Sequence, residues 1–406
     1  MHEPRRTIPG QTIDSEIDVA VVGAGPVGGA LACHLARGGR RVVVIDRAAL
    51  PPMEHPDFDG RAYAIAAGNQ RFLAEAGLWD GLPFTPCPIE QIRVSDGRPG
   101  RPPSPLFLHF DHAEANTGPF GWIVEARSLR IALNAALAAT PGLTVFAPAA
   151  VQVQRQAEGA NIEIAGGPRL AARLVVAAEG RASPLREAAG IPVTRIPYRQ
   201  SGLVAAIAHE RDHRNVALEH FLPGGPFAQL PMSGTEDAPH LSGIVFTERT
   251  ATAERLHRLP DAAFTAEVAR RLGHHLGAIR LVGKRWCYPL SAMHAARYFD
   301  TRLALVGDSA HGVHPIAGQG LNLGLRDAAV LAELILAGGD PGSEGLLRAY
   351  QAARRGPNLL MLAATDALDR LFSNDNPAIR LARDLGIAAV HRAPPLKRFF
   401  IRRAMG

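Results

Sequence analysis

A glycine-rich turn near the N-terminus has the residue types and spacing of a phosphate-binding loop. Residues 21–28 are Val-Val-Gly-Ala-Gly-Pro-Val-Gly, between a β-branched stretch and small, helix-forming residues. Gly23 permits a tight turn, Gly25 lets the backbone approach a pyrophosphate, and Gly28 lets the helix pack against the strand. Free N–H groups at the helix start would attract the phosphates. A chance match in a glycine-rich loop is the alternative, but the flanking strand and helix favour a dinucleotide site.

An acidic residue closes the next expected strand. Residues 41–45 are Arg-Val-Val-Val-Ile, and Asp46 follows them, at roughly the spacing from the glycines that such sites use. A carboxylate there accepts hydrogen bonds from a ribose diol and repels a 2′-phosphate. The strand–helix–strand unit therefore predicts a parallel sheet that binds FAD or NAD rather than NADP.

A second segment that could bind a cofactor follows a buried strand at 301–306. Asp308 at the strand end is a carboxylate placed to bond sugar-like hydroxyls, and Gly318 and Gly320 would let a backbone loop lie flat against a planar ring. The helix expected at 321–337 would direct its N–H donors and positive dipole end at that ring. Such a helix stabilises the negative charge of a reduced flavin, so this segment favours FAD.

Two histidines in the same segment have other interpretations. His311 and His314 are either structural residues or a metal pair. No third histidine completes a ligand set in this run, and we therefore expect no metal site.

Residues 302–327 resemble the flavin-binding signature of the class A aromatic hydroxylases, which have the para-hydroxybenzoate hydroxylase-like fold. The chain from about Asp18 onward is also similar to a narrower branch, the ubiquinone-biosynthesis FAD-dependent hydroxylases. The matching stretches are Asp59-Gly-Arg61-Ala-Tyr-Ala-Ile, Gly77-Leu-Trp79, Gly121-Trp-Ile-Val-Glu125-Ala-Arg127, Phe221-Leu-Pro-Gly-Gly-Pro226, residues 314–327 and Ala404-Met-Gly. The segment 307–327 is the most specific of them.

The element pattern and the resemblance together imply an α/β fold. It comprises a Rossmann-type FAD-binding domain, an inserted antiparallel-sheet substrate domain and a helical C-terminus. The inserted sheet is expected because short alternating runs broken by turns between 196 and 245 indicate an antiparallel second layer. The expected parts are a disordered tail (1–16), the FAD-binding domain (17–190, with a substrate-side segment at about 80–118, and 286–340), the substrate-binding sheet (191–285) and C-terminal helices (341–406).

The resemblance assigns cofactor contacts to particular residues. Gly23, Gly25 and Gly28 would hold the FAD pyrophosphate, Asp46 the adenosine ribose, and Asp308 the ribityl chain. Arg61 would meet the flavin or its phosphates and Arg127 the ribityl-phosphate region, although for each arginine taken alone a surface charge is the favoured interpretation. The remaining expected cofactor residues are Arg47, Pro315, Gly318, Gln319, Gly320, Leu321 and Asn322.

Two positions depart from the family pattern. The usual Ala-Asp-Gly turn is Ala178-Glu179-Gly180, with a side chain one methylene longer, and the usual Glu-Asn-Arg is Glu125-Ala126-Arg127. Contacts that rely on the shorter acid or on the amide are expected to differ, whereas the cofactor site is expected to remain.

The resemblance implies a monooxygenase that hydroxylates the aromatic ring of a polyprenylphenol intermediate in ubiquinone biosynthesis, using NAD(P)H and dioxygen through a flavin C4a-hydroperoxide. NAD(P)H would be a transient co-substrate, because no second glycine motif with an acid-ended strand occurs. The alternatives are a monooxygenase of a soluble phenol or hydroxybenzoate, a geranylgeranyl reductase-like flavin reductase, and a non-enzymatic scaffold that holds FAD in a biosynthetic assembly.

No catalytic acid or base is assigned from the sequence, because the flavin performs the bond chemistry. The substrate-side candidates are His220, Gln229, Tyr198 and His294, each with a structural alternative. The ring position, the choice between NADH and NADPH, and the oligomeric state carry no sequence signal.

Composition limits the partners and the compartment. The net charge of +6 is spread over 44 basic and 38 acidic residues that are interleaved along the 406-residue chain, so nucleic-acid binding is not expected. Three distant cysteines indicate a reducing cytoplasm. Residues 396–403, Leu-Lys-Arg-Phe-Phe-Ile-Arg-Arg, form either a peripheral docking helix on the inner face of the membrane or a terminal helix packed on the core, and packing is favoured.

Overall fold

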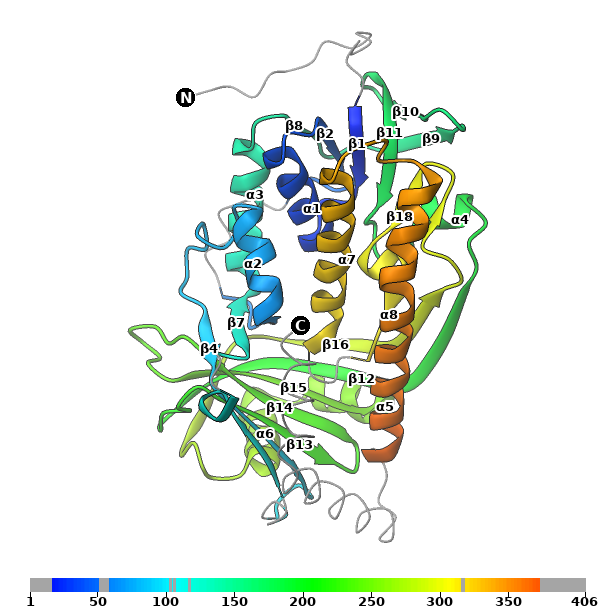
Figure 1. Ribbon diagram of the computed structural model, residues 1–406. Helices are drawn as coiled ribbons and strands as arrows, with labels where there is room; N and C mark the ends of the chain where they lie inside the picture. The colour runs from blue at the N-terminus through cyan, green and yellow to red at the C-terminus, as the bar shows by residue number, and fades with distance from the viewer. Residues whose placement is uncertain are drawn as a thin grey trace.

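The computed structural model describes residues 17–50, 58–101, 104, 107–115, 118–314 and 318–372. Figure 1 shows two parts, an upper one in which helices flank a parallel sheet and a lower one built on a broad, mostly antiparallel sheet. The long helix α8 (Glu344–Phe372) extends from the upper part to the edge of the lower sheet. Within the described ranges, no helix combines the length and the apolar character needed to span a bilayer.

The first sheet has a parallel core in the order β18-β11-β1-β2-β8. These strands are apolar and buried, as strands covered on both faces must be. Two antiparallel strands, β9 and β10, continue from β11, and β17 pairs with β18. The bounds are β1 (Ile17–Val22), β2 (Val42–Ile45), β8 (Leu143–Phe146), β9 (Val151–Arg155), β10 (Ala160–Ile164), β11 (Arg169–Ala177), β17 (Phe299–Asp300) and β18 (Leu303–Leu305).

Helix α1 (Pro26–Arg37) packs between α3 (Ala126–Ala139) and α7 (Gln319–Leu336) against this sheet. Small residues on α1 allow the close approach: a Cβ on Gly29 would lie 2.6 Å from the Leu133 side chain. The starts of α1 and α7 therefore lie near each other, although almost three hundred residues separate them.

The second sheet has the strand order β19-β16-β12-β15-β14-β13-β5-β6. Its pairs are antiparallel except β13 with β5, which is parallel. Helices α5 and α6 cover one face through an apolar core that includes Phe227, Phe246 and Phe264. The bounds are β5 (Gln91–Asp96), β6 (Leu108–Asp111), β12 (Val193–His209), β13 (Val216–Leu222), β14 (Gly225–Met232), β15 (Leu241–Arg249), α5 (Thr250–His257), α6 (Asp261–Leu272), β16 (Ile279–Ala295) and β19 (His311–Gly312).

A three-stranded sheet in the order β3-β7-β4 connects the two parts. It is bordered by α2, which also contacts α7. The remaining bounds are β3 (Ala62–Ala66), α2 (Ala67–Glu75), β4 (Cys87–Ile89), η1 (Ala113–Ala115), β7 (Gly121–Glu125), α4 (Pro184–Ala188) and η2 (Gly307–Ser309).

The fold class predicted from the sequence is confirmed, and several element bounds differ. The second sheet does not end at 285, because β16 runs to Ala295 through the predicted domain boundary. Strands β8 and β9 are separated at Pro148, which has no N–H for a ladder. The helix expected from Leu321 begins at Gln319. Residues 1–16 and 373–406, expected as a tail and further helices, lie outside the described residues.

Candidate cofactor and substrate cavity

The turn between β1 and α1 has the geometry of a phosphate-binding loop. Gly23 has a φ of +112°, and a Cβ there would lie 2.3 Å from the Ala178 carbonyl oxygen. A Cβ on Gly28 would lie 2.1 Å from the Gly23 oxygen, so both positions require glycine. Gly25 differs, because a Cβ on it would meet nothing within 4 Å. Gly23 and Gly28 thus shape the turn, and Gly25 leaves space above its backbone.

Helix α1 begins at this turn with no side-chain cap. Gly25 is the N-cap residue, no side chain bonds the first N–H groups, and Pro26 occupies the first turn. Uncapped N–H groups at a helix start carry partial positive charge and attract anions. The Asp46 carboxylate lies beside the turn, where it accepts hydrogen bonds from the Ala24 N–H (2.7 Å) and the Ala48 N–H (2.9 Å).

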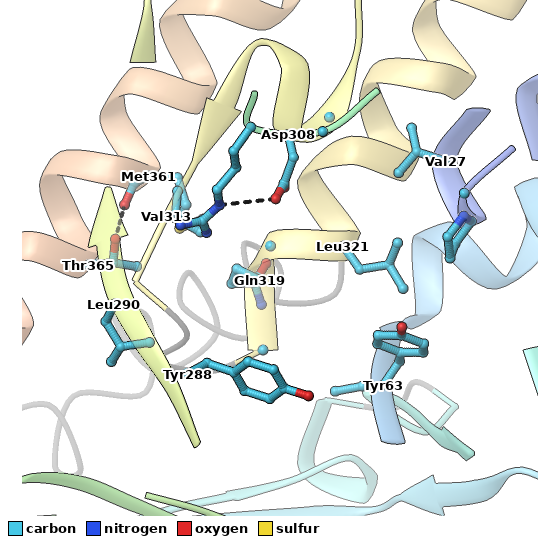
Figure 2. A pocket seen from close by; sticks show the side chains of 18 of the residues that line it. Val27, Tyr63, Tyr288, Leu290, Asp308, Val313, Gln319, Leu321, Met361 and Thr365 are labelled. Carbon is cyan, nitrogen blue, oxygen red and sulfur yellow. Dashed lines mark hydrogen bonds and ion pairs between the residues drawn. The ribbon is translucent and has the colours of Figure 1, made fainter. Parts of the chain in front are cut away.

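Helix α7 begins at the same cavity, also without a side-chain cap. Its N-cap residue Gly318 is left-handed, with a φ of +61°. Gln319, Gly320 and Leu321 line the cavity together with the glycine turn of α1. Figure 2 shows Gln319 and Leu321 facing the same space as Val27, which lies at the start of α1. Two uncapped helix starts therefore face one cavity.

Asn322 lies behind this wall and fixes it in place. Its Oδ1 accepts hydrogen bonds from the Ala66 N–H (2.8 Å) and the Asn69 amide (2.7 Å), and its Nδ2 donates to the Ala64 (2.7 Å) and Gly318 (3.0 Å) carbonyls. The side chain is almost fully buried. Asn322 therefore joins the start of α7 to β3 and does not line the cavity itself.

A buried charge network holds the segment that carries Asp308. The Asp327 carboxylate accepts hydrogen bonds from the Gly307 N–H (3.2 Å), the Arg354 guanidinium (2.8 Å) and the Asn358 amide (2.9 Å), and it bonds the His311 imidazole (2.5 Å). Burial alone would raise its pKa, but His311 and Arg354 outweigh burial and hold the pKa below the ordinary value. Asp327 of α7 thus connects η2, β19 and α8.

Asp308 itself faces the cavity, as Figure 2 shows. Its Oδ2 lies 3.1 Å from Nε of Arg181, which also donates to the Ser291 carbonyl (3.0 Å). Both side chains are roughly half exposed, so solvent screens the pair. Arg181 lines the cavity as well. The sequence analysis did not select it, although it follows the Glu179-Gly180 turn directly.

Glu179 accepts hydrogen bonds from the Ser183 hydroxyl (2.6 Å) and the Leu185 N–H (3.2 Å) at the start of α4. Burial raises the pKa of the Glu179 carboxyl above its ordinary value, against these two bonds. The longer acid at this departure from the family pattern is therefore engaged as a helix cap while it borders the cavity.

Two predicted cofactor arginines are placed elsewhere. Arg61 pairs with Asp59 (2.6 Å) and lies over the Trp286 ring, and Arg127 pairs with Glu125 (2.6 Å) and lies over the Phe84 ring. Neither is among the described residues that line the cavity. Arg130, one turn further along α3, instead donates to the Ala24 carbonyl (3.0 Å) in the glycine turn. The sequence could have indicated it only through the helical spacing from Arg127.

The other predicted cofactor residues have mixed positions. Gly23, Gly25, Gly28, Asp46, Arg47, Asp308, Gly318, Gln319, Gly320 and Leu321 line the cavity. Pro315 lies outside the described residues. Two segments far apart in the sequence thus meet around one space.

That space has a volume of about 2140 Å³, more than twice the roughly 300–1,000 Å³ of a typical small-molecule site. One end is lined by the starts of α1 and α7. The other end is lined by the second sheet and by one side of α8, and these walls are mainly apolar. The cavity is large enough for a dinucleotide and a second molecule.

The four substrate-side candidates from the sequence do not line this cavity. His220 bonds the Ser95 hydroxyl (2.9 Å), Gln229 the Ser242 hydroxyl (3.0 Å) and His294 the Tyr298 hydroxyl (3.2 Å). Tyr198 packs edge-on against His314. Each has a structural environment in the described chain. Glu219, the neighbour of His220, lines the cavity instead.

A parallel sheet with an uncapped glycine turn, an acid-ended second strand and a second uncapped helix start defines a dinucleotide-binding oxidoreductase architecture. The chain belongs to the FAD binding domain family, whose model matches residues 16–361. The predictions of FAD and of the family are therefore confirmed.

Two curated relatives cover nearly the whole chain. It is 51% identical over 398 residues to ubiquinone hydroxylase UbiL of Rhodospirillum rubrum, covering 97% of this chain and 90% of the relative. It is 33% identical over 398 residues to the 3-demethoxyubiquinol 3-hydroxylase of Escherichia coli, covering 96% and 98%.

The fold also matches solved structures. The p-nitrophenol 4-monooxygenase PnpA of Pseudomonas putida superposes with a TM-score of 0.74 at 20% identity, over 96% of this chain and 99% of that one. This likeness shows the fold. The FAD binding domain family and the two hydroxylase relatives make the chain an FAD-dependent monooxygenase.

Proposed function

We propose that this monooxygenase hydroxylates the aromatic ring of a polyprenylated phenol in ubiquinone biosynthesis, with NAD(P)H as a transient co-substrate. The names of the two curated relatives, a ubiquinone hydroxylase and a demethoxyubiquinol hydroxylase, support this pathway. The observation that carries the proposal is the single cavity that joins two uncapped helix starts to a long apolar wall.

The helix starts fit the cofactor. Space above the Gly25 and Gly320 backbones, where a Cβ would meet nothing within 4 Å, suits close approach by a pyrophosphate and a flat ring. Asp46 would bond the adenosine ribose, and Asp308 with Arg181 would bond the ribityl hydroxyls. FAD, when bound, supplies the acceptance of a hydride and the activation of dioxygen. The protein's part is to orient the two molecules and to exclude water.

An apolar stripe on α8 supports a polyprenyl substrate. The cavity-lining positions recur at helical spacing, which places them on one side of the helix. They are Pro357, Leu360, Met361, Ala364, Thr365, Leu368, Leu371 and Phe372. Three of these leucines remain exposed, with Leu360 at 58%, Leu368 at 39% and Leu371 at 44%. Exposed apolar side chains that continue an apolar cavity wall suit a long hydrocarbon tail.

Complementation tests this function. The gene would be expressed in bacterial strains that are each blocked at one ring hydroxylation, and quinone intermediates would be identified by mass. We expect restoration of at least one hydroxylation, with FAD bound to the purified protein. Purified protein that holds FAD and hydroxylates soluble phenols but restores none of the strains would contradict the polyprenylphenol assignment.

Peripheral membrane contact through residues 396–403 and membership of a biosynthetic assembly stay predictions. That segment lies outside the described residues. Four basic residues beside apolar bulk would bind anionic lipid in a salt-dependent way. Co-sedimentation with anionic vesicles at low and high salt, with and without residues 396–406, separates docking from packing on the core.

A further inference from the structure

The wall that the second sheet presents to the cavity contains one carboxyl side chain among its described lining residues; its other ionisable lining residue there is Tyr288 of β16, a phenol. Ala217, Glu219 and Phe221, which share one face of β13, line the cavity, and Leu218 between them also reaches it. Among the described lining residues from β5, β6, β13, β14 and β15, Glu219 is the single ionisable one. An ionisable group in the middle of an apolar wall is unfavourable for folding, and this cost points to a functional role for Glu219.

The cross-strand neighbours of Glu219 are all apolar. On one side it pairs with Val94 of β5, which pairs with Leu108 of β6. On the other side it pairs with Ala228 of β14, which pairs with Val245 of β15. All four neighbours line the cavity with it. The row thus surrounds the carboxyl with hydrocarbon.

Glu219 has no hydrogen-bond or ion-pair partner among the described residues. Burial, the one cause of the shift, raises the pKa of its carboxyl to about 7. No other titratable group of the surrounding elements contributes to this shift, and several of these groups have partners of their own. They are Asp96 on β5, His109 on β6, His220 on β13, Glu248 on β15 and Asp369 on α8.

An unpartnered carboxyl on an apolar wall destabilises a fold, because burial removes its hydration without replacement. Several other buried or half-buried acids of the described chain have partners, such as Glu248 with Arg271 (2.8 Å) and Glu125 with Arg127 (2.6 Å). A group of this kind that faces a large cavity is a candidate for contact with a ligand. Its partner is then a hydrogen-bond donor on the bound molecule.

We propose that Glu219 binds the ring hydroxyl of the phenol substrate and accepts its proton as the ring is oxygenated, an inference that rests on the proposed function. In this step the phenol O–H bond breaks and an O–H bond forms on the Glu219 carboxyl. The electron pair left on the phenol oxygen moves into the ring, and the ring carbon that accepts oxygen becomes more nucleophilic. Glu219 returns the proton to water when the product leaves.

The chemistry of the carboxyl matches this role. A base is most effective when its pKa lies near the working pH, and burial brings Glu219 there. At pH 8 the free carboxyl is mostly ionised and accepts a charge-assisted hydrogen bond. At pH 6 it is mostly protonated, and that bond weakens.

The test uses the FAD-loaded full-length protein and two probes, 2-geranylphenol and its methyl ether 2-geranylanisole, which has no hydroxyl. Binding is followed by perturbation of the flavin absorbance. We expect the parent to prefer the phenol over the ether by about tenfold at pH 8, with most of that preference lost at pH 6. Glu219→Gln should bind both probes alike at both pH values and should form hydroxylated 2-geranylphenol at least about tenfold more slowly.

Two further variants keep the test decisive. Glu219→Leu removes the buried polar group, so it should fold, retain FAD and bind 2-geranylanisole, while losing the preference for the phenol. Glu163→Gln makes the same change on β10, where the glutamate is about half exposed and pairs with Arg169. This control should bind both probes and hydroxylate 2-geranylphenol as the parent does. If both Glu219 variants keep the full preference for the phenol and the pH profile of the parent, the role of Glu219 is overturned, whereas the proposed function is not. If the parent binds neither probe and complements no strain, the proposed function fails with it.

Discussion

Two carboxylates in different parts of the molecule, Asp327 fully buried and Glu219 half-buried, have opposite surroundings. Asp327 lies behind the loop that carries Asp308 and has four partners, including His311 and Arg354. Glu219 lies on the sheet wall and has no partner among the described residues. A buried charge is tolerated when hydrogen bonds replace its hydration. The comparison indicates that the cofactor side is fixed by the chain alone, whereas the substrate side is completed by a ligand.

Removing the charge of Asp327 should have the largest effect. In Asp327→Asn the guanidinium of Arg354 and the imidazole of His311 lose their counter-charge, and we expect the free energy of unfolding to fall by about 3–5 kcal/mol. FAD retention should fall with it, because Gly307 and the Asp308 loop depend on this carboxylate. Urea unfolding at pH 7, followed by intrinsic fluorescence, measures the change.

The control is Glu344→Gln, which removes an exposed pair with Arg348 on α8. An exposed pair contributes about 0.5 kcal/mol. Equal effects of the two substitutions would show that the Asp327 network is not what holds the loop.

In contrast to Asp327→Asn, Glu219→Leu should raise the free energy of unfolding. The folded pKa is about 7 and the ordinary value is 4.5, so the folded chain keeps its proton where the unfolded chain has lost it. The parent therefore loses stability as pH rises from about 4.5 to 7, and the full cost is present above pH 7. Leucine has no such cost, and the variant should be more stable at pH 8 by on the order of 2 kcal/mol and nearly equal to the parent at pH 4.5.

Thermal unfolding at a series of pH values measures this difference. Glu163→Gln should show no such pH dependence, because that side chain is exposed. A Glu219→Leu protein that is less stable than the parent at pH 8 would mean that the carboxyl has a partner in the folded chain, and the contrast with Asp327 would disappear.

The sequence predicted the cofactor side and the substrate side of the cavity unequally well, for a physical reason. The glycine turn at 23–28 and the loop around Asp308 are continuous pieces of chain whose geometry follows from local residue types. Arg61 and Arg127 do not line the cavity, because each pairs with an acid two residues earlier in the chain and lies over an aromatic ring. Short strands between 196 and 245 were expected, but the phase of β13 was not. A shift of one residue exchanges the faces of a strand, and the cavity face carries Glu219 rather than His220.

Asp308 lies between these two extremes, since it has one partner and is about half exposed. Asp308→Ala should leave the unfolding temperature of the FAD-free protein nearly unchanged, because the screened pair with Arg181 contributes little. The affinity for FAD should fall by about tenfold, as expected for the loss of a charged hydrogen bond to a hydroxyl. Titration of the FAD-free protein, followed by quenching of flavin fluorescence, gives the two dissociation constants. Equal constants would place the ribityl chain away from Asp308.

Glu179→Asp should have the smallest effect. The shorter acid can keep one of two hydrogen bonds at the start of α4, those from the Ser183 hydroxyl and the Leu185 N–H. We expect a loss of about 0.5–1 kcal/mol in the free energy of unfolding, as for a weakened helix cap, and unchanged FAD affinity. Urea unfolding and the same flavin titration test both parts. A change in FAD affinity without a change in stability would show that the acid serves the cofactor rather than the helix, and Glu179 would then join Asp308 on the cofactor side of the cavity.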